Sequence, residues 1–93
     1  MKKHLDITIY GEIEQSGFRF QAVEVGLELN LTGVVKDYQP KQLSLSVEGE
    51  VDDLQKFLKW CHIGPEKAKI EKVDYQSSTE LQNYENFSAE WFM

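Results

Sequence analysis

Hydrophobic and polar residues alternate along several short stretches of the chain, which is the pattern of strands with one buried face. Residues 5–10 carry leucine or isoleucine at every second position, and residues 43–48 repeat this pattern with leucine and valine. Residues 33–38 and 68–73 are further short runs with valine or isoleucine, and a break in the alternation inside the second of these runs suggests a bulge. Residues 87–91 alternate once more and predict an optional fifth strand at the edge of a sheet.

Two other stretches carry apolar residues at helical spacing. Within residues 18–29, apolar residues lie towards one side of a helix, and glutamine and glutamate lie towards the other. Residues 51–61 repeat apolar residues at intervals of three and four, which predicts a second helix with one buried face. Asn30 is expected to end the first helix, and Gly64 and Pro65 are expected to end the second. The buried stripe predicted for the second helix consists of Leu54, Phe57, Leu58 and Cys61.

The order of these elements is β-α-β-β-α-β, with the optional strand at the end. Pro40 presets a turn between the second and third strands, so these strands should be antiparallel neighbours. Because each helix has one apolar face, both helices are expected to pack on one face of an antiparallel sheet. The sequence therefore predicts an α+β fold, a ferredoxin-like βαββαβ two-layer sandwich formed by a single domain of residues 1–93. Because many unrelated functions share this fold, the function has to be inferred from the site.

The charge balance argues against binding to nucleic acid. The chain has 16 acidic and 10 basic residues, a net charge of −6 and a pI near 4.8. Such a surface repels phosphate backbones and anionic membranes. The aromatic residues occur at unrelated spacings, so they are expected to pack in the core or at the sheet edge and not to stack on bases. No apolar run approaches the length that crosses a membrane, and no signal-peptide core follows the first residues, so a cytoplasmic location is expected.

Cysteine and histidine are too few for a disulfide framework or a zinc site. Cys61 is the single cysteine, so no intramolecular disulfide can form, and it is expected to be a small core residue. His4 and His62 are the two histidines, and both are expected to be exposed. A His/Cys zinc site therefore cannot be assembled, and no metal or other cofactor is predicted.

The stretch from Tyr10 to Arg19 joins the first predicted strand to the first predicted helix. A strand followed by a loop that opens a helix directs free backbone N–H groups beyond the helix start, where the helix dipole adds positive potential. Arg19 lies in the first helical turn, where a cation is slightly unfavourable for the helix itself. Its position therefore suggests an external anionic partner, and the stretch predicts an anion-binding site.

Two segments resemble the signatures of the acylphosphatases. The run Gly11-x-Ile13-x-x-x-x-Phe18-Arg19 is similar to the first signature, in which a glycine, a valine, Gln-Gly-Val and then Phe-Arg lead through the phosphate-binding loop into the first helix. The glycine, basic residue, catalytic asparagine, valine and final glycine of the second signature are matched in spacing by Gly33, Lys36, Asp37, Leu43 and Gly49. The resemblance covers about residues 5–73 and extends more loosely to Phe87.

The resemblance implies a hydrolase of acyl phosphates that works without a metal or a covalent intermediate. Its ligand would be a small-molecule acyl phosphate or a phosphate anion, and we also expect a monomer. Arg19 matches the arginine that binds the phosphoryl group, and Asp37 matches the asparagine that orients the attacking water. The residues that match the phosphate-binding loop are Ile13, Glu14, Gln15, Ser16, Gly17, Phe18 and Arg19.

The departures from the family pattern fall inside both signatures. Gln15 stands where the family loop has glycine, and a positive φ at this residue would cost roughly 1–2 kcal/mol. Asp37 replaces an amide by an acid, which accepts hydrogen bonds but donates none when ionised. Glu12 and Glu14 add carboxylates near a site for an anion. Reduced or altered activity is therefore expected.

Three classes of function remain open at this stage. The first is an acylphosphatase with lowered activity. The second is an anion-binding module that keeps the fold and Arg19 but lacks the group that orients water. The third is a protein-interaction domain that uses an exposed sheet edge or the acidic surface. The residues that separate the first two classes are Glu14, Gln15 and Asp37.

Overall fold

The computed structural model describes residues 1–89 of the chain, and its elements follow the predicted order. They are β1 (Lys2–Glu12), α1 (Phe18–Glu28), β2 (Thr32–Gln39), β3 (Gln42–Glu50), α2 (Val51–Ile63), β4 (Lys69–Ser78) and β5 (Phe87–Ala89). The α+β class and the ferredoxin-like βαββαβ arrangement are confirmed, with a fifth strand added. The last two residues of the predicted strand 87–91 lie outside the described residues.

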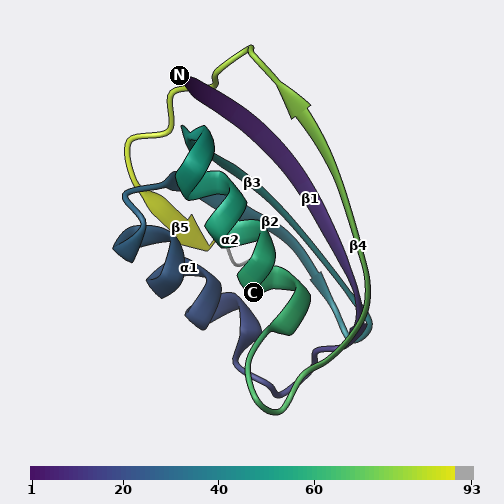
Figure 1. Cartoon of the computed structure of the whole chain (residues 1–93). Helices are drawn as coiled ribbons and strands as arrows, with labels where there is room; N and C mark the ends of the chain where they lie inside the picture. Colours follow the sequence, from purple (N-terminus) through teal and green to yellow (C-terminus); the bar gives the residue numbers. More distant parts are fainter. Residues whose placement is uncertain (90–93) are drawn as a thin grey trace.

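The strands form one sheet in the order β4-β1-β3-β2-β5, and both helices cover one face of it (Figure 1). The strands β1 to β4 pair antiparallel with their neighbours, whereas β5 pairs parallel to β2. Figure 1 shows the reason for this orientation: the segment 79–86 leads from β4 past the N-terminus to the opposite edge of the sheet. The chain therefore enters β5 in the direction of β2.

The core lies between the helices and the sheet. The inward side chains of β1, β2 and β3 supply nearly half of it, because successive side chains of a strand point to opposite faces. Together with residues of both helices and β5, they form one buried apolar cluster. The cluster contains Leu5, Ile7, Ile9, Ile13, Phe18, Ala22, Leu31, Val35, Leu43, Leu45, Val47, Leu54, Phe57, Cys61 and Phe87.

The buried stripe predicted for α2 is present, with one difference. Leu54, Phe57 and Cys61 are buried, which also confirms Cys61 as a core residue. Leu58 is only half-buried, because it lines a small cavity of about 170 Å³ that also borders Tyr75 of the edge strand β4. Phe57 is therefore a better probe of core packing in this helix than Leu58.

The end of α1 and its packing against β5 depend on two local features. Asn30 follows the helix with a φ of 60°, the left-handed conformation predicted for a residue that ends a helix. Within α1, a Cβ atom at Gly26 would overlap the ring of Phe87. The glycine therefore lets the helix approach β5 closely, which explains a residue that is otherwise unfavourable in a helix.

Two bulges interrupt the regular pairing of the strands. Tyr10 pairs with Lys72 and Gly11 pairs with Ile70, so Glu71 is an extra residue in β4, as the break in alternation predicted. The other bulge was not predicted. Val35 pairs with Leu45 and Asp37 pairs with Ser44, so Lys36 is an extra residue in β2.

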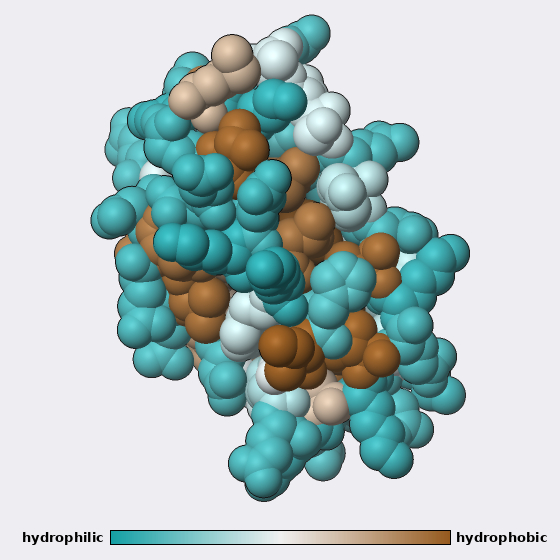
Figure 2. Space-filling model, viewed as in Figure 1, coloured by the Kyte–Doolittle hydropathy of each residue, from teal (hydrophilic) through white to brown (hydrophobic). Residues whose placement is uncertain are grey.

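The helix-bearing face of the molecule is mostly hydrophilic, and apolar side chains show mainly along its middle (Figure 2). The large exposed apolar side chains include Phe20 and Leu27 of α1 and Ile63 at the end of α2. Among the described residues, no helix is long and apolar enough to cross a membrane.

Candidate active site

The loop between β1 and α1 lies beside the β2–β3 hairpin, at the end of the sheet opposite the N-terminus (Figure 1). Two backbone hydrogen bonds hold it there: the N–H of Gly11 donates to the carbonyl of Lys41 over 3.1 Å, and the N–H of Ile13 donates to the carbonyl of Pro40 over 3.5 Å. The first signature is therefore held against the β2–β3 turn, which lies inside the second signature.

Ser16 organises the interior of the loop. Its N–H and its hydroxyl both donate to the carbonyl of Ile13, over 3.3 Å and 2.6 Å, and its Oγ accepts the N–H of Phe18 over 3.2 Å. Ser16 is buried, and so are Ile13 and Phe18 on either side of it. The serine that replaces the family's valine therefore closes the turn and satisfies one of the free N–H groups at the start of α1.

The exposed residues of the loop present backbone N–H groups to solvent. The N–H groups of Glu14, Gln15 and Gly17 donate to no atom within residues 1–89. Gln15 has a φ of 64° and Gly17 a φ of 77°, so the chain turns left-handed on both sides of Ser16. Turns of this kind, together with the N-terminus of a helix, form concave groups of N–H donors that bind anions.

Gln15 adopts the positive φ whose cost was considered from the sequence. Gln15 occupies the place of a family glycine and takes the positive φ that glycine adopts without cost. The left-handed conformation of Gln15 costs the loop roughly 1–2 kcal/mol of conformational energy.

Arg19 lies in the first turn of α1 and is half-buried. Its guanidinium carbon is 4.7 Å from the ring centroid of Tyr38 and 5.1 Å from that of Phe20, both within the range of cation–π contacts. Tyr38 lies near the end of β2 and packs against the core cluster. The contact between Arg19 and Tyr38 therefore joins the start of α1 to the end of β2.

Asp37 precedes Tyr38 directly, so the fold brings the two predicted catalytic positions to the same end of the sheet. The Asp37 side chain is exposed, and its Oδ2 accepts the Nε2 amide of Gln39 over 3.3 Å. Within residues 1–89 no ion pair or hydrogen bond links Asp37 to Arg19. Glu12 and Glu14 are exposed as well.

No cluster of metal-ligating side chains occurs in the part of the chain that the structure describes. Cys61 is fully buried, and burial raises the pKa of its thiol, so this cysteine is an inert core residue.

His4 is a correction to the sequence-based prediction, because it is only 6% exposed. Its Nδ1 lies 2.7 Å from Oε2 of Glu48, and its Nε2 lies 2.9 Å from Oδ1 of Asp6. Ser46 also donates its hydroxyl to Asp6. His4 and Asp6 are two positions apart in β1, so both point to the sheet face away from the helices. This spacing could have indicated the cluster. His62 is exposed as predicted.

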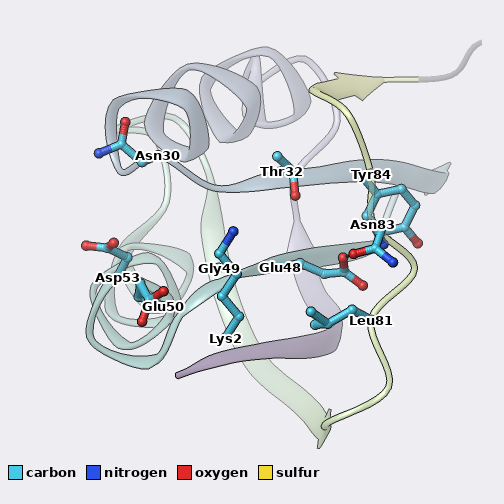
Figure 3. Close-up of a pocket in the computed structure, with 10 residues that line it drawn as sticks. All are labelled: Lys2, Asn30, Thr32, Glu48, Gly49, Glu50, Asp53, Leu81, Asn83 and Tyr84. Carbon is cyan, nitrogen blue, oxygen red and sulfur yellow. Dashed lines mark hydrogen bonds between the residues drawn. The ribbon is translucent and has the colours of Figure 1, made fainter.

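Glu48 also holds the segment that leads to β5. Its carboxylate accepts the backbone N–H groups of Gln82 and Asn83, the second over 2.9 Å. Figure 3 shows Glu48 pointing from β3 towards the part of the chain that carries Asn83 and Tyr84. These residues line a polar cavity of about 360 Å³. The cluster therefore lies far from the loop around residue 15 and has a structural role.

The His4 cluster makes stability dependent on pH. Burial alone lowers the pKa of His4, but the hydrogen bonds and charges of Glu48 and Asp6 outweigh burial and raise it above 6.5. Burial alone raises the pKa of Glu48 above 4.5, but the N–H of Gln82, then His4 and Asn83, outweigh it and lower it. In the same way, Ser46, His4 and the more distant charge of Lys36 lower the pKa of Asp6.

We expect the free energy of unfolding to fall on both sides of an optimum near pH 5 to 6.5. A raised pKa of His4 stabilises the fold below 6.5, and this stabilisation is lost as the pH rises through the folded-state value. The lowered pKa of Glu48 stabilises the fold above 4.5, and this stabilisation is lost in acid. Urea unfolding between pH 5 and 8 measures the alkaline limb.

The matched control for this experiment is the second histidine. His4→Gln should flatten the decrease above pH 6.5, whereas His62→Gln should leave it unchanged. An alkaline decrease that persists in full in His4→Gln would contradict the role of His4.

The comparisons with known proteins agree with the geometry of this site. The family model described as acylphosphatase matches residues 5–89. An acylphosphatase of Nocardioides sp. is 30% identical over 80 residues, which span 86% of this chain and 81% of that protein. An acylphosphatase of Geobacter metallireducens is 28% identical over 91 residues, 98% of each chain.

A solved structure shows the same fold. The acylphosphatase from Coxiella burnetii superposes with a TM-score of 0.90 at 25% identity, over 96% of this chain and 93% of that chain. Since the family model covers nearly all the described residues, and the fold and both signatures agree with it, the chain belongs to the acylphosphatase family.

Proposed function

We propose that this chain hydrolyses the carboxyl–phosphate bond of acyl phosphates, with an activity that the residues at positions 15 and 37 reduce or alter. The observation that carries the proposal is the meeting of three features at one end of the sheet. They are the loop N–H groups of Glu14, Gln15 and Gly17, the half-buried Arg19, and the end of β2 at Asp37. Relatives named acylphosphatases match the chain over most of its length, which supports the proposal.

The phosphoryl group would be held by the loop and by Arg19. The N–H groups of Glu14, Gln15 and Gly17 supply donors on a fixed backbone, and the dipole of α1 adds positive potential. A guanidinium carries several donors in one plane and pairs with phosphoryl oxygens in a bidentate manner. This set of donors stabilises the charge on the transferring phosphoryl group.

The reaction itself is a displacement at phosphorus. The oxygen of a water molecule forms a bond to phosphorus, and the bond between phosphorus and the acyl oxygen breaks. The carboxylate leaves with the electron pair of that bond, and the protons of the water pass to the inorganic phosphate or to solvent. Holding the water in line with the breaking bond removes part of the entropic barrier.

Asp37 matches the family's water-orienting asparagine in the sequence, so it is the candidate to hold this water, and it differs from an asparagine in two ways. A carboxylate accepts both protons of a water but donates nothing to a phosphoryl oxygen. It also repels the anionic substrate, with a strength that depends on the local dielectric. Both differences raise the barrier relative to an amide at the same place.

Asp37→Asn is therefore expected to increase the hydrolysis of benzoyl phosphate by about ten- to a hundredfold, which corresponds to about 1.4–2.7 kcal/mol of barrier. The restored donor and the lost negative charge act on the same transition state. The measurement is kcat/KM of pure protein, with Asp74→Asn as the control because Asp74 is an exposed strand aspartate at the β4 edge. This control should leave the rate unchanged.

Two other outcomes discriminate among the alternatives. If Asp37 acts as a general base, the natural chain is the faster of the two, and its rate falls in acid as the carboxylate gains a proton. If neither protein hydrolyses benzoyl phosphate while inorganic phosphate still shifts the amide signals of residues 13–19, the chain is an anion-binding module. The exposed carboxylate of Asp37, held by Gln39, is the observation that favours this second function.

A further inference from the structure

Arg19 contacts the ring of Tyr38, a residue whose position is not among those that the two signatures specify. An arginine side chain has many rotamers, and binding phosphate in a bidentate manner requires one orientation of its guanidinium. Arg19 lies in the first turn of α1, yet its guanidinium carbon is 4.7 Å from the ring centroid of Tyr38 in β2. An aromatic ring from a different element therefore limits where this guanidinium can lie.

The bulge in β2 explains why Tyr38 is on the same side of the sheet as α1. Val35 pairs with Leu45 and Tyr38 pairs with Leu43, and these two leucines are two residues apart on the buried face of β3. Val35 and Tyr38 therefore share a face although they are three residues apart. If Lys36 were paired regularly and not bulged, strict alternation over three positions would place Tyr38 on the face opposite to Val35.

Of the rings that residues 1–89 place beside Arg19, Tyr38 is held more firmly than Phe20. It is half-buried, packs against the core cluster and belongs to a paired strand. Phe20 is 58% exposed and lies one residue from Arg19 on the same helix. A ring against the face of a guanidinium does not itself use the in-plane N–H donors with which a guanidinium binds phosphoryl oxygens.

We propose that Tyr38 is a positioning residue that holds the Arg19 guanidinium for binding of the phosphoryl group. This inference rests on the proposed function of the loop and Arg19. The role belongs to the aromatic ring and not to the hydroxyl, and it depends on the bulge at Lys36. The bulge thus places the ring on the face of the sheet that α1 covers, beside Arg19.

The test compares Tyr38→Leu, which removes the ring, with Tyr38→Phe, which keeps it. Two signals are recorded by NMR: the Nε–H resonance of Arg19, and the amide shifts of residues 13–19 during titration with inorganic phosphate. Tyr38→Leu should move the Nε–H resonance of Arg19 and raise the Kd for phosphate about two- to thirtyfold. Tyr38→Phe should resemble the natural chain in both measurements.

Tyr75→Leu is the matched control, because Tyr75 is an exposed tyrosine of the β4 edge. It should change neither signal. Urea unfolding identifies a general loss of structure, and Tyr38→Met replaces Tyr38→Leu if the latter is not folded. A general structural role of Tyr38 would lower stability without a selective change in the Arg19 resonance.

The possible results separate this inference from the function on which it rests. If the natural chain binds phosphate and Tyr38→Leu binds it equally well, the positioning role is wrong while the proposed function stands. An unchanged Arg19 resonance in Tyr38→Leu overturns the stacking contact itself. If the natural chain shows no response to phosphate, the proposed function fails, and the positioning role fails with it even when the Arg19 resonance moves.

Discussion

Replacing Arg19 by alanine is expected to lower kcat/KM for benzoyl phosphate by about a hundred- to a thousandfold, the range found when one donor to a developing charge is removed. Arg19 is the only arginine of the chain, so no second guanidinium can take over its role. Arg19 is half-buried next to Tyr38, so its guanidinium is less hydrated than that of a fully exposed side chain. Charge interactions are stronger in such an environment.

The same substitution should abolish the response to inorganic phosphate. In the natural chain, phosphate is expected to shift the amide signals of residues 13–19 and to raise the melting temperature, because a ligand that binds only the folded state stabilises it. Arg19→Ala should show neither effect. Lys56→Ala is the control, because Lys56 is an exposed cation on the other helix.

Two results would contradict different parts of this interpretation. If Arg19→Ala retains the full phosphate response, the guanidinium is not part of the site, and the N–H groups of the loop alone bind the anion. If the natural chain gives no response at high phosphate, the loop does not bind anions at all.

Phe57→Ala is expected to reduce the free energy of unfolding by about 3–5 kcal/mol, a large share of the total for a domain of this size. The Phe57 side chain is fully buried in the core cluster. Its ring centroid lies 5.9 Å from that of Trp60 and 5.9 Å from that of Phe87 in β5. Because few atoms can collapse into the space of a lost aromatic ring, a cavity is left between α2, the sheet and the edge strand.

Lys59→Ala is the matched control, because Lys59 lies on the exposed side of the same helix. It should change the free energy of unfolding by less than about 0.5 kcal/mol. Urea denaturation at one pH measures both variants. Similar losses in the free energy of unfolding for the two variants would show that Phe57 and Lys59 are wrongly assigned to the buried and exposed sides of α2.

The elements and their order followed from the sequence alone. The alternation in residues 5–10 and 43–48 and the helical spacing in 51–61 report which side of each element is apolar, and that is a local property. The ends of helices are local too, because Asn30 and Gly64 act through their own backbone conformations. The spacing of Gly11, Phe18 and Arg19 likewise identified the loop that the family comparison then supported.

The positions of residues distant in the chain needed the tertiary structure. The sequence alone predicted an exposed His4, but Glu48 of a neighbouring strand buries it and forms a hydrogen bond with it across 44 positions of the chain. The spacing of His4 and Asp6 places both on one face of β1, but it does not identify Glu48 as the partner of His4. The parallel pairing of β5 depends in the same way on the path of residues 79–86, which Glu48 holds.

For the candidate site, the sequence determined which residues could bind a phosphoryl group, and the fold decided how they are supported. Arg19 and Asp37 were recognised from their spacing, whereas the sequence indicated only the cost of a positive φ at Gln15, and the structure showed that Gln15 adopts it. The bulge at Lys36 and the Tyr38 ring beside Arg19 were not foreseen, because a bulge is defined by the register of two strands and a stacking contact by the packing of a helix on a sheet. Both are properties of pairs of elements, and one element's pattern of apolar residues does not contain them.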